Sequence, residues 1–98
     1  MSITLPGKII EEYTERSTKE RKNRIGLVRF GDTDRPIILD LVPNAKIGDY
    51  VHVHVGFATD VVPEREALRA YEMYGSKSPE KELEAEQAMP ETTRRQRA

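Results

Sequence analysis

Short apolar stretches alternate with polar turns along the first half of the chain, and this pattern predicts a mainly β fold. The first stretch, Ile3 to Ile10, is interrupted by Pro6-Gly7. Because proline has no N–H to donate to a sheet, we expect a short strand with a kink there. Residues 11–24 are almost all polar and offer little to a core, so they predict an exposed hairpin connection.

Three further apolar runs follow. The runs 25–30 and 36–42 flank a turn rich in Asp and Gly at 31–34, which predicts a hairpin. The run 50–55 has the clearest alternation of period two. We expect Val51, Val53 and Val55 on the core side of this strand, and Tyr50, His52 and His54 on the other side, facing solvent or a partner.

A helix is predicted after this strand. We place Gly56 and Phe57 at the corner between the strand and the helix, with Phe57 in the core. Pro63 suits a first helical turn, and Gly75 suits a helix end. Apolar residues recur at helical spacing between them, at Ala67, Leu68, Tyr71 and Tyr74.

These elements together predict a small OB-like β-barrel followed by one C-terminal α-helix. We assign residues 1–75 to the barrel and helix. Residues 76–98 are poor in apolar side chains, so we expect a polar, flexible tail that is partly helical, about from Pro79 to Ala88, or disordered.

Composition limits the class of protein. The 98 residues suit one domain, and no apolar run approaches the ~20 residues that span a bilayer. The N-terminus has no apolar signal core, so we expect a cytoplasmic protein without a membrane partner. The net charge of −1 predicts no strong overall attraction to nucleic acid. Cysteine is absent, which excludes disulfides and thiolate ligands.

Candidate catalytic and metal-binding groups are few. No nucleophile and base can be assembled from the motifs, so we expect no enzyme. His52 and His54 lie two apart on one predicted strand face, but two imidazoles without a third ligand make an incomplete metal site. The basic segment 16–24, on an OB-like barrel, leaves single-stranded nucleic-acid binding as an alternative. Against it, Glu20 interrupts the basic run and no aromatic residue lies within it.

Three ordered motifs carry a resemblance to a known family. They are Met-Ser-Ile-Thr-Leu-Pro-Gly-Lys at 1–8, Leu-Val-Pro at 41–43 followed by Ile-Gly-Asp at 47–49, and His-Val-Gly-Phe-Ala at 54–58. Over about residues 1–74 the chain resembles the HypC/HupF family of nickel–iron hydrogenase maturation chaperones. The resemblance implies an OB-like barrel with a C-terminal helix, in agreement with the pattern.

The resemblance also implies a role and partners. Such proteins pair with HypD while an iron carrying cyanide and carbon monoxide, the Fe(CN)2CO unit, is built. They then escort this unit to the hydrogenase large-subunit precursor. A HypD-like protein and a large-subunit precursor are therefore the expected partners, and the resemblance implies a scaffold that turns over no substrate.

The sequence departs from the family at its second residue. Ser2 stands where the family has the cysteine proposed to bind iron, and a hydroxyl is a poor iron ligand compared with a soft thiolate. We therefore expect no cofactor to be held by this chain alone. A natural paralogue, an engineered replacement and ligation by the α-amino group all stay open as explanations.

The resemblance places the candidate partner and cofactor contacts in two segments. They are Ser2, Pro6, Gly7 and Lys8 in the first, and His54, Gly56 and Phe57 in the second. His54 has the position of the family's recurrent histidine, where the resemblance implies an imidazole that hydrogen-bonds cofactor ligands and is a candidate metal ligand. Pro6-Gly7 serves as a strand kink, as a docking element, or as both. We interpret Lys8 as a solvated strand residue and His52 as an exposed histidine without a site.

Overall fold

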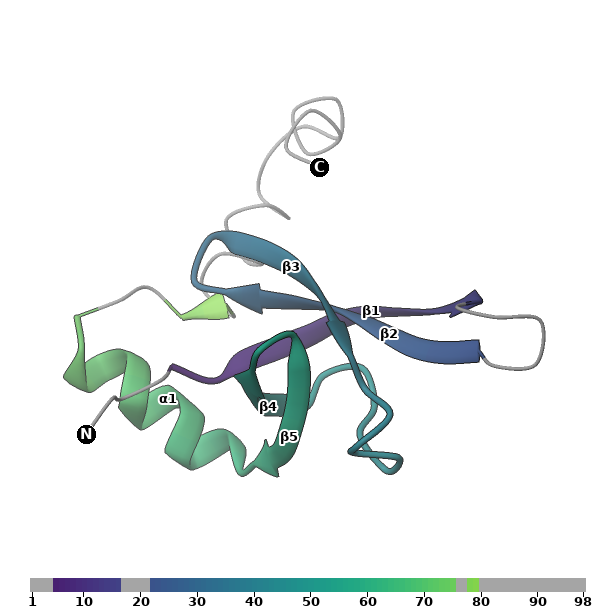
Figure 1. Ribbon diagram of the computed structural model, residues 1–98. Coiled ribbons are helices and arrows are strands. Elements are labelled where there is room, and N and C mark those ends of the chain that lie inside the picture. The colour runs from purple at the N-terminus through teal and green to yellow at the C-terminus, as the bar shows by residue number, and fades with distance from the viewer. Residues whose placement is uncertain (1–4, 17–21, 76–77, 80–98) are drawn as a thin grey trace.

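The computed structural model describes residues 5–16, 22–75 and 78–79 (Figure 1). Within these residues it contains five strands and one helix. They are β1 (Gly7–Arg16), β2 (Lys22–Phe30), β3 (Thr33–Ile38), β4 (Tyr50–His54), β5 (Phe57–Val62) and α1 (Glu64–Met73).

The five strands form a closed barrel in the order β1-β2-β3-β5-β4. Neighbouring strands are antiparallel, except that β3 meets β5 in parallel at Ile38 and Phe57. Strand β1 closes the barrel by pairing its start, Gly7 and Lys8, with Val51 and Tyr50 of β4. This is the OB-like barrel with a C-terminal helix that the sequence predicted.

Two clusters of buried side chains fill the molecule. The larger one lies inside the barrel and is made of Ile9, Val28, Ile37, Leu39, Val42, Ala45, Val51 and Ala58. The smaller one lies between the barrel and α1 and is made of Tyr50, Val62, Ala67 and Tyr71. Helix α1 therefore covers the barrel at the junction of β4 and β5 (Figure 1).

The predicted exposed hairpin connection at 11–24 is a hairpin, but most of it is strand rather than loop. β1 continues to Arg16 and β2 begins at Lys22, and the two pair in register from Glu11 opposite Leu27 to Arg16 opposite Lys22. The paired ends project beyond the barrel as a two-stranded arm (Figure 1). Polarity misled the prediction because a ladder of backbone hydrogen bonds satisfies the main chain whatever side chains it carries.

Strand β3 is shorter than the predicted run 36–42. It ends at Ile38, and the chain then folds through successive turns, with Val42 N donating to Leu39 O at 3.0 Å and Ala45 N to Val42 O at 3.0 Å. The side chains of Leu39, Val42 and Ala45 point into the larger core cluster. Their hydrophobicity therefore reflects a loop that fills the barrel rather than a longer strand.

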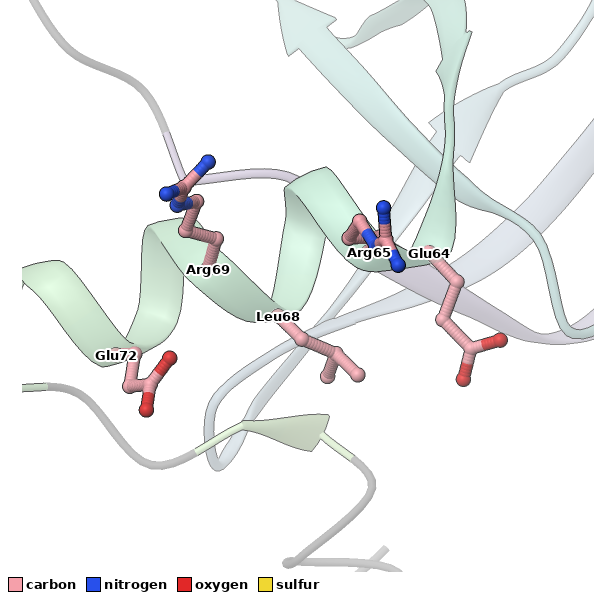
Figure 2. Close-up of a pocket in the computed structure, with 5 residues that line it drawn as sticks. All are labelled: Glu64, Arg65, Leu68, Arg69 and Glu72. Carbon is pink, nitrogen blue, oxygen red and sulfur yellow. The ribbon is translucent and has the colours of Figure 1, made fainter.

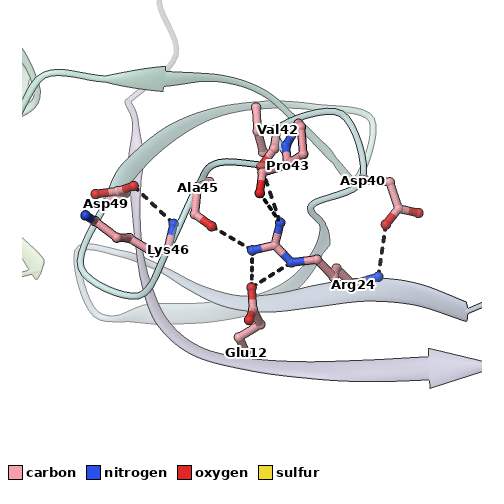
Figure 3. Close-up of polar contacts among 8 residues, drawn as sticks. All are labelled: Glu12, Arg24, Asp40, Val42, Pro43, Ala45, Lys46 and Asp49. Atoms are coloured by element: carbon pink, nitrogen blue, oxygen red, sulfur yellow. Dashed lines mark hydrogen bonds and ion pairs between the residues drawn. The ribbon is translucent and has the colours of Figure 1, made fainter.

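Arg24, which was predicted to lie in an exposed connection, organises this loop (Figure 3). Its guanidinium donates to the carbonyl oxygens of Pro43 at 3.0 Å and Ala45 at 2.6 Å, and it pairs with the carboxylate of Glu12. Its backbone N–H donates to Asp40 Oδ1 at 3.0 Å. The Leu-Val-Pro motif is thereby fixed to the base of the arm.

The strand at 50–55 and the segment after it also differ from the prediction. Tyr50 is 1% exposed, whereas Val55 is 81% exposed and has a φ of +50°. Val55 and Gly56 form a two-residue hairpin turn, and Phe57 opens the unpredicted strand β5 instead of a corner leading to the helix. Phe57 is 39% exposed, so its predicted place in the core is wrong.

A change of register explains the failed alternation in β4. The pairing of β4 with β5 shifts between His52 and Val53, so that His52 faces Asp60 while Val53 faces Ala58. Such a bulge changes the twist and orientation of the strand at that point. The hairpin turn itself suits the strands because left-handed dihedrals at both turn residues match their twist.

The helix agrees with the prediction. It follows Pro63, carries Glu64 and Glu66 in its first turn, and ends before Gly75, whose φ is +65°. Acidic residues at that end are favourable because the N-terminus of a helix carries a partial positive charge. Among the described residues, no helix has the length and apolar character needed to cross a bilayer.

Candidate functional site

Pro6 is buried directly before β1 and is held there by the helix. The hydroxyl of Tyr71 donates a hydrogen bond to the carbonyl oxygen of Pro6, across 65 residues of sequence. Burial raises the pKa of Tyr71 to about 12. A hydrogen bond from the Gly31 backbone lowers the same pKa, but by less. Tyr71 therefore keeps its proton at neutral pH and remains a donor to Pro6.

Gly7 is buried, and its lack of a side chain is what allows the barrel to close. A Cβ atom at this position would lie 2.7 Å from Phe30 Cε1 and closer still to the side chain of Val28. Real Cβ atoms are essentially never so close to a neighbour. The Pro-Gly step thus has a structural role. The proline is anchored by Tyr71, and the glycine leaves space for the side chains of β2.

Lys8 is half-buried and pairs across the sheet with Tyr50. Its ammonium lies 5.8 Å from the centroid of the Tyr50 ring, which is within the range of an attractive cation–π contact. Lys8 is therefore packed on the barrel wall rather than fully solvated as predicted.

A hollow of about 290 Å³ opens between the residue that precedes β1, strand β4, the end of β5 and helix α1. We call it the Pro6 hollow. It is lined by Pro6, His52, Val62, Glu66, Arg69, Ala70, Met73 and Tyr74. Strands β1 and β4 are antiparallel, and Gly7 pairs with Val51. The residue before Gly7 therefore lies beside the residue after Val51, which places Pro6 next to His52.

The imidazole of His52 is held in place by strand β5. His52 Nδ1 lies 2.9 Å from Asp60 Oδ2, and the hydroxyl of Thr59 donates to Asp60 Oδ1 at 2.8 Å. The pKa of Asp60 is lowered, mainly by the hydrogen bond from Thr59. A small loss of hydration opposes this effect, and His52 adds to it. Asp60 is thus a carboxylate at neutral pH, and it orients the His52 ring.

The second predicted segment lies at the opposite end of β4. His54 is the last residue of the strand, is exposed, and pairs with Phe57. No hydrogen bond or ion pair of the His54 side chain is seen among the described residues. Gly56 borders a separate hollow of about 740 Å³ that is lined by Phe30, Thr33, Arg35, Pro36, Ile37, Val53 and Val55.

A third hollow follows the outer face of α1 (Figure 2). Its side chains are Glu64, Arg65, Leu68, Arg69 and Glu72, with acidic residues at both ends and arginines between them. Arg69 also borders the Pro6 hollow. The mixture of charges on this face is typical of a solvated helix surface and favours no single ligand.

The structure therefore brings together some predicted site residues and separates others. Pro6, Gly7 and Lys8 lie beside the first half of β4, whereas His54, Gly56 and Phe57 surround its far end. Ser2 lies outside the described residues. In the described part of the chain, no three His, Cys, Asp or Glu side chains form a group that could hold a metal ion.

Two contacts were missed by the sequence analysis. The pair of His52 and Asp60 was missed because β5 was not predicted, so that Asp60 had no cross-strand position. The contact of Tyr71 with Pro6 had a partial signal, since Tyr71 falls on the apolar face of the predicted helix. No local pattern indicates which backbone oxygen a buried tyrosine hydroxyl will reach.

Comparison with known proteins agrees with this fold and its motifs. The chain is 39% identical over 67 residues to the hydrogenase maturation factor HypC of Synechocystis sp., covering 68% of this chain and 84% of that protein. It is 28% identical over 74 residues to the hydrogenase maturation factor HypC of Cupriavidus necator, covering 76% of this chain and 73% of that protein. The model of the HupF/HypC family matches residues 1–74, which include the five strands and α1. The chain therefore belongs to the HupF/HypC family.

Proposed function

We propose that this protein is a cytoplasmic, non-catalytic chaperone in the assembly of a nickel–iron hydrogenase. It binds a HypD-like partner, the hydrogenase large-subunit precursor, or both in turn, during delivery of the Fe(CN)2CO unit. The observation that carries the proposal is the family match over residues 1–74, which includes all three motifs. Both relatives are named as hydrogenase maturation factors, which supports the same role here.

The geometry at Pro6 supports a docking role for the N-terminal segment. The contact of Tyr71 with the Pro6 carbonyl and the tight packing at Gly7 fix the point where this segment joins the barrel. A rigid anchor of this kind lowers the entropy that is lost when a segment docks on a partner. The exposed side chains of Met73 and Tyr74 next to this anchor add apolar area for a partner.

A pull-down tests the role directly. The protein carries an affinity tag at its C-terminus, which leaves the N-terminal segment free, and is expressed in a cell that makes a nickel–iron hydrogenase. We expect it to recover a HypD-like protein or the unprocessed large subunit, whereas the tag alone recovers neither. Recovery of neither by the tagged protein would contradict the proposed function.

The chemistry at position 2 separates docking from iron binding. Because a serine hydroxyl stays protonated and is a poor ligand for iron, Ser2→Cys should raise the iron content of the complex with the HypD-like partner severalfold. The infrared bands of bound cyanide and carbon monoxide should strengthen in parallel. Equal iron and equal bands in the wild type and in Ser2→Cys would show that position 2 is not a ligand.

One of the basic residues that favoured the nucleic-acid alternative is already engaged within the protein. The guanidinium of Arg24 is engaged by the Pro43 and Ala45 carbonyls and by Glu12, so it is not available to a phosphate. Binding to single strands would be strongest at low salt and would fall steeply with ionic strength. A gel shift with single-stranded DNA at low salt checks this alternative, and we expect no shift.

A further inference from the structure

Strand β3 leaves most of one edge without a partner strand. It pairs with β2 from Thr33 to Ile38, but its pairing with β5 is limited to Ile38 opposite Phe57. There the backbone N–H of Ile38 donates to the carbonyl oxygen of Gly56 at 2.9 Å. In the described part of the chain, residues 33–37 therefore have no paired strand on the side of β5.

The hydrogen bond of Ile38 shows which backbone groups face this free edge. Successive residues of a strand direct their N–H and C=O groups to alternate sides. Because the N–H of Ile38 points toward β5, the backbone groups of Pro36 and Asp34 face the same side. Pro36 suits this position, since a proline lacks the N–H that an edge would leave unpaired. The carbonyl oxygens of Pro36 and Asp34 and the N–H of Asp34 are thus placed to pair with an added strand.

The hollow of about 740 Å³ described above lies beside this edge, and we call it the β3 hollow. Phe30 and Val53 line it and also pack on the larger core cluster, of which Ile37 is a member. Val55, which is 81% exposed, borders the same hollow. The core is therefore accessible from outside where β3 and β5 do not pair. An apolar side chain that enters the hollow leaves water and gains contact with the core.

The charge at the β3 hollow is positive. Of the described residues that line it, Arg35 alone is charged. Its side chain is exposed, and no hydrogen bond or ion pair of Arg35 is seen among the described residues. The neighbouring Asp34 is engaged by Arg29, whose Nε lies 2.6 Å from Asp34 Oδ1. The hollow therefore favours a ligand that brings a carboxylate and disfavours one that brings a lysine or an arginine.

We infer that the β3 hollow docks an extended segment of a protein partner, which adds as a strand to the free edge of β3. The segment inserts an apolar side chain over Phe30 and Val53 and places an acidic side chain beside Arg35. In strand addition, main-chain hydrogen bonds give affinity, and pockets for alternate side chains give specificity. The inference goes beyond the proposed function, because it assigns a surface and a mode of recognition that involve no iron.

A purely protective role of the same residues makes a different prediction. Proline and charged side chains on an edge strand prevent unwanted pairing with other chains. If Pro36 and Arg35 served only this purpose, an extended peptide would not bind at the β3 hollow. Docking predicts binding that depends on the charge at position 35.

The test uses the isolated full chain and a short peptide with blocked ends, in which one threonine separates a valine from a glutamate. This spacing places the valine and the glutamate on the same face of an extended chain. In an NMR titration we expect the resonances of Phe30, Val53 and Val55 to shift. Hydrogen exchange of the Asp34 N–H should slow, because that group gains a main-chain partner.

Two control peptides separate the contributions of charge and of strand geometry. Replacing the glutamate by glutamine should weaken binding about fivefold, which is the effect of one exposed ion pair. Placing the valine and the glutamate next to each other puts them on opposite faces, so this peptide should also bind more weakly.

Three variants locate the site on the protein. Arg35→Glu should weaken binding of the glutamate peptide and strengthen binding of a peptide with lysine in its place. Arg65→Glu is the matched control, because it replaces an exposed arginine outside the β3 hollow, and it should bind as the wild type. Val55→Asn removes an apolar side chain but suits the φ of +50°, so it should weaken binding without a loss of thermal stability. Thermal unfolding verifies that all three are folded.

The outcomes separate this inference from the proposed function. Absence of shifts at the β3 hollow with every peptide overturns the inference, and so does an equal affinity of wild type and Arg35→Glu for the glutamate and lysine peptides. Shifts of Phe30 and Val53 that depend on protein concentration without any peptide would identify a second copy as the occupant and would also overturn it. Peptide binding at the hollow, in a protein whose pull-down recovers no maturation partner, contradicts the proposed function and supports the inference.

Discussion

Strand β4 begins in a buried junction and ends in an exposed turn. At its start, Tyr50 and Val51 are 1% and 0% exposed, and Pro6 is tied to Tyr71 beside them. At its end, Val55 is 81% exposed and Gly56 has open space around it. The Pro-Gly motif lies beside the buried end and mainly builds the barrel. The His-Val-Gly-Phe-Ala motif lies at the exposed end and is presented at the surface.

Glycines in similar motifs of this protein are required for different physical reasons. Gly7 is needed because neighbouring side chains occupy the space of a Cβ atom. Gly56 has no neighbour within 4 Å of such an atom, but its φ of +81° is a conformation that L side chains rarely adopt. Gly7 is therefore required by packing, and Gly56 is required by its backbone conformation.

The largest expected effect is at the buried end. Gly7→Val would force its side chain into Val28 and Phe30, so we expect a loss of about 3 kcal/mol in the free energy of unfolding, near the upper range for overpacked cores. Urea denaturation monitored by circular dichroism measures it. A loss no greater than that of Gly56→Val would contradict the contrast between the two ends.

The next effect is at the link between the helix and Pro6. Tyr71→Phe leaves the buried Pro6 carbonyl without its donor, which should cost about 1.5 kcal/mol. Burial raises the pKa of Tyr71 from 10.0 to about 12, so this contribution is complete below pH 10 and is lost as the pH rises through 12. The stability difference between wild type and Tyr71→Phe should therefore shrink over that range. A difference that stays constant from pH 9 to pH 12 would show that Tyr71 does not titrate as expected.

A smaller loss is expected at the exposed turn. Gly56→Ala meets no atom within 4 Å and is disfavoured only by its positive φ, so it should cost about 1 kcal/mol. Gly56→Asn is the matched control, because asparagine tolerates this conformation better, and it should cost less. Thermal unfolding of both variants makes the comparison. Equal losses would indicate that the backbone conformation is not the cause.

The smallest effect is expected at the His52 and Asp60 pair. Asp60→Asn should cost no more than a few tenths of a kcal/mol, since both side chains are largely exposed. The hydrogen bond from Thr59, together with His52, lowers the pKa of Asp60. The small contribution is therefore present above the ordinary pKa of an aspartate and disappears as the pH falls through the lowered value. A loss larger than that of Gly56→Ala would make this pair a structural element.

The sequence by itself determined the class of fold and the position of the helix. Apolar runs separated by turn residues indicated parts of β1 to β4 but not β5, and the helical spacing of Ala67 and Tyr71 with Gly75 beyond them indicated α1. These signals are local, because strand alternation, helix periodicity and glycine stops depend on neighbours in the chain. The ordered motifs also determined the family, which the match over residues 1–74 confirmed.

Only the tertiary structure decided where the motifs lie relative to one another. The bulge after His52 and the turn at Val55 changed which side chains of β4 are buried, and the pairing with β5 brought Asp60 to His52. The polar arm at 11–16 and 22–24 formed because its backbone groups pair with each other, which no side-chain pattern reports. Contacts such as Tyr71 with Pro6 join residues 65 positions apart, and their existence depends on how the whole barrel closes.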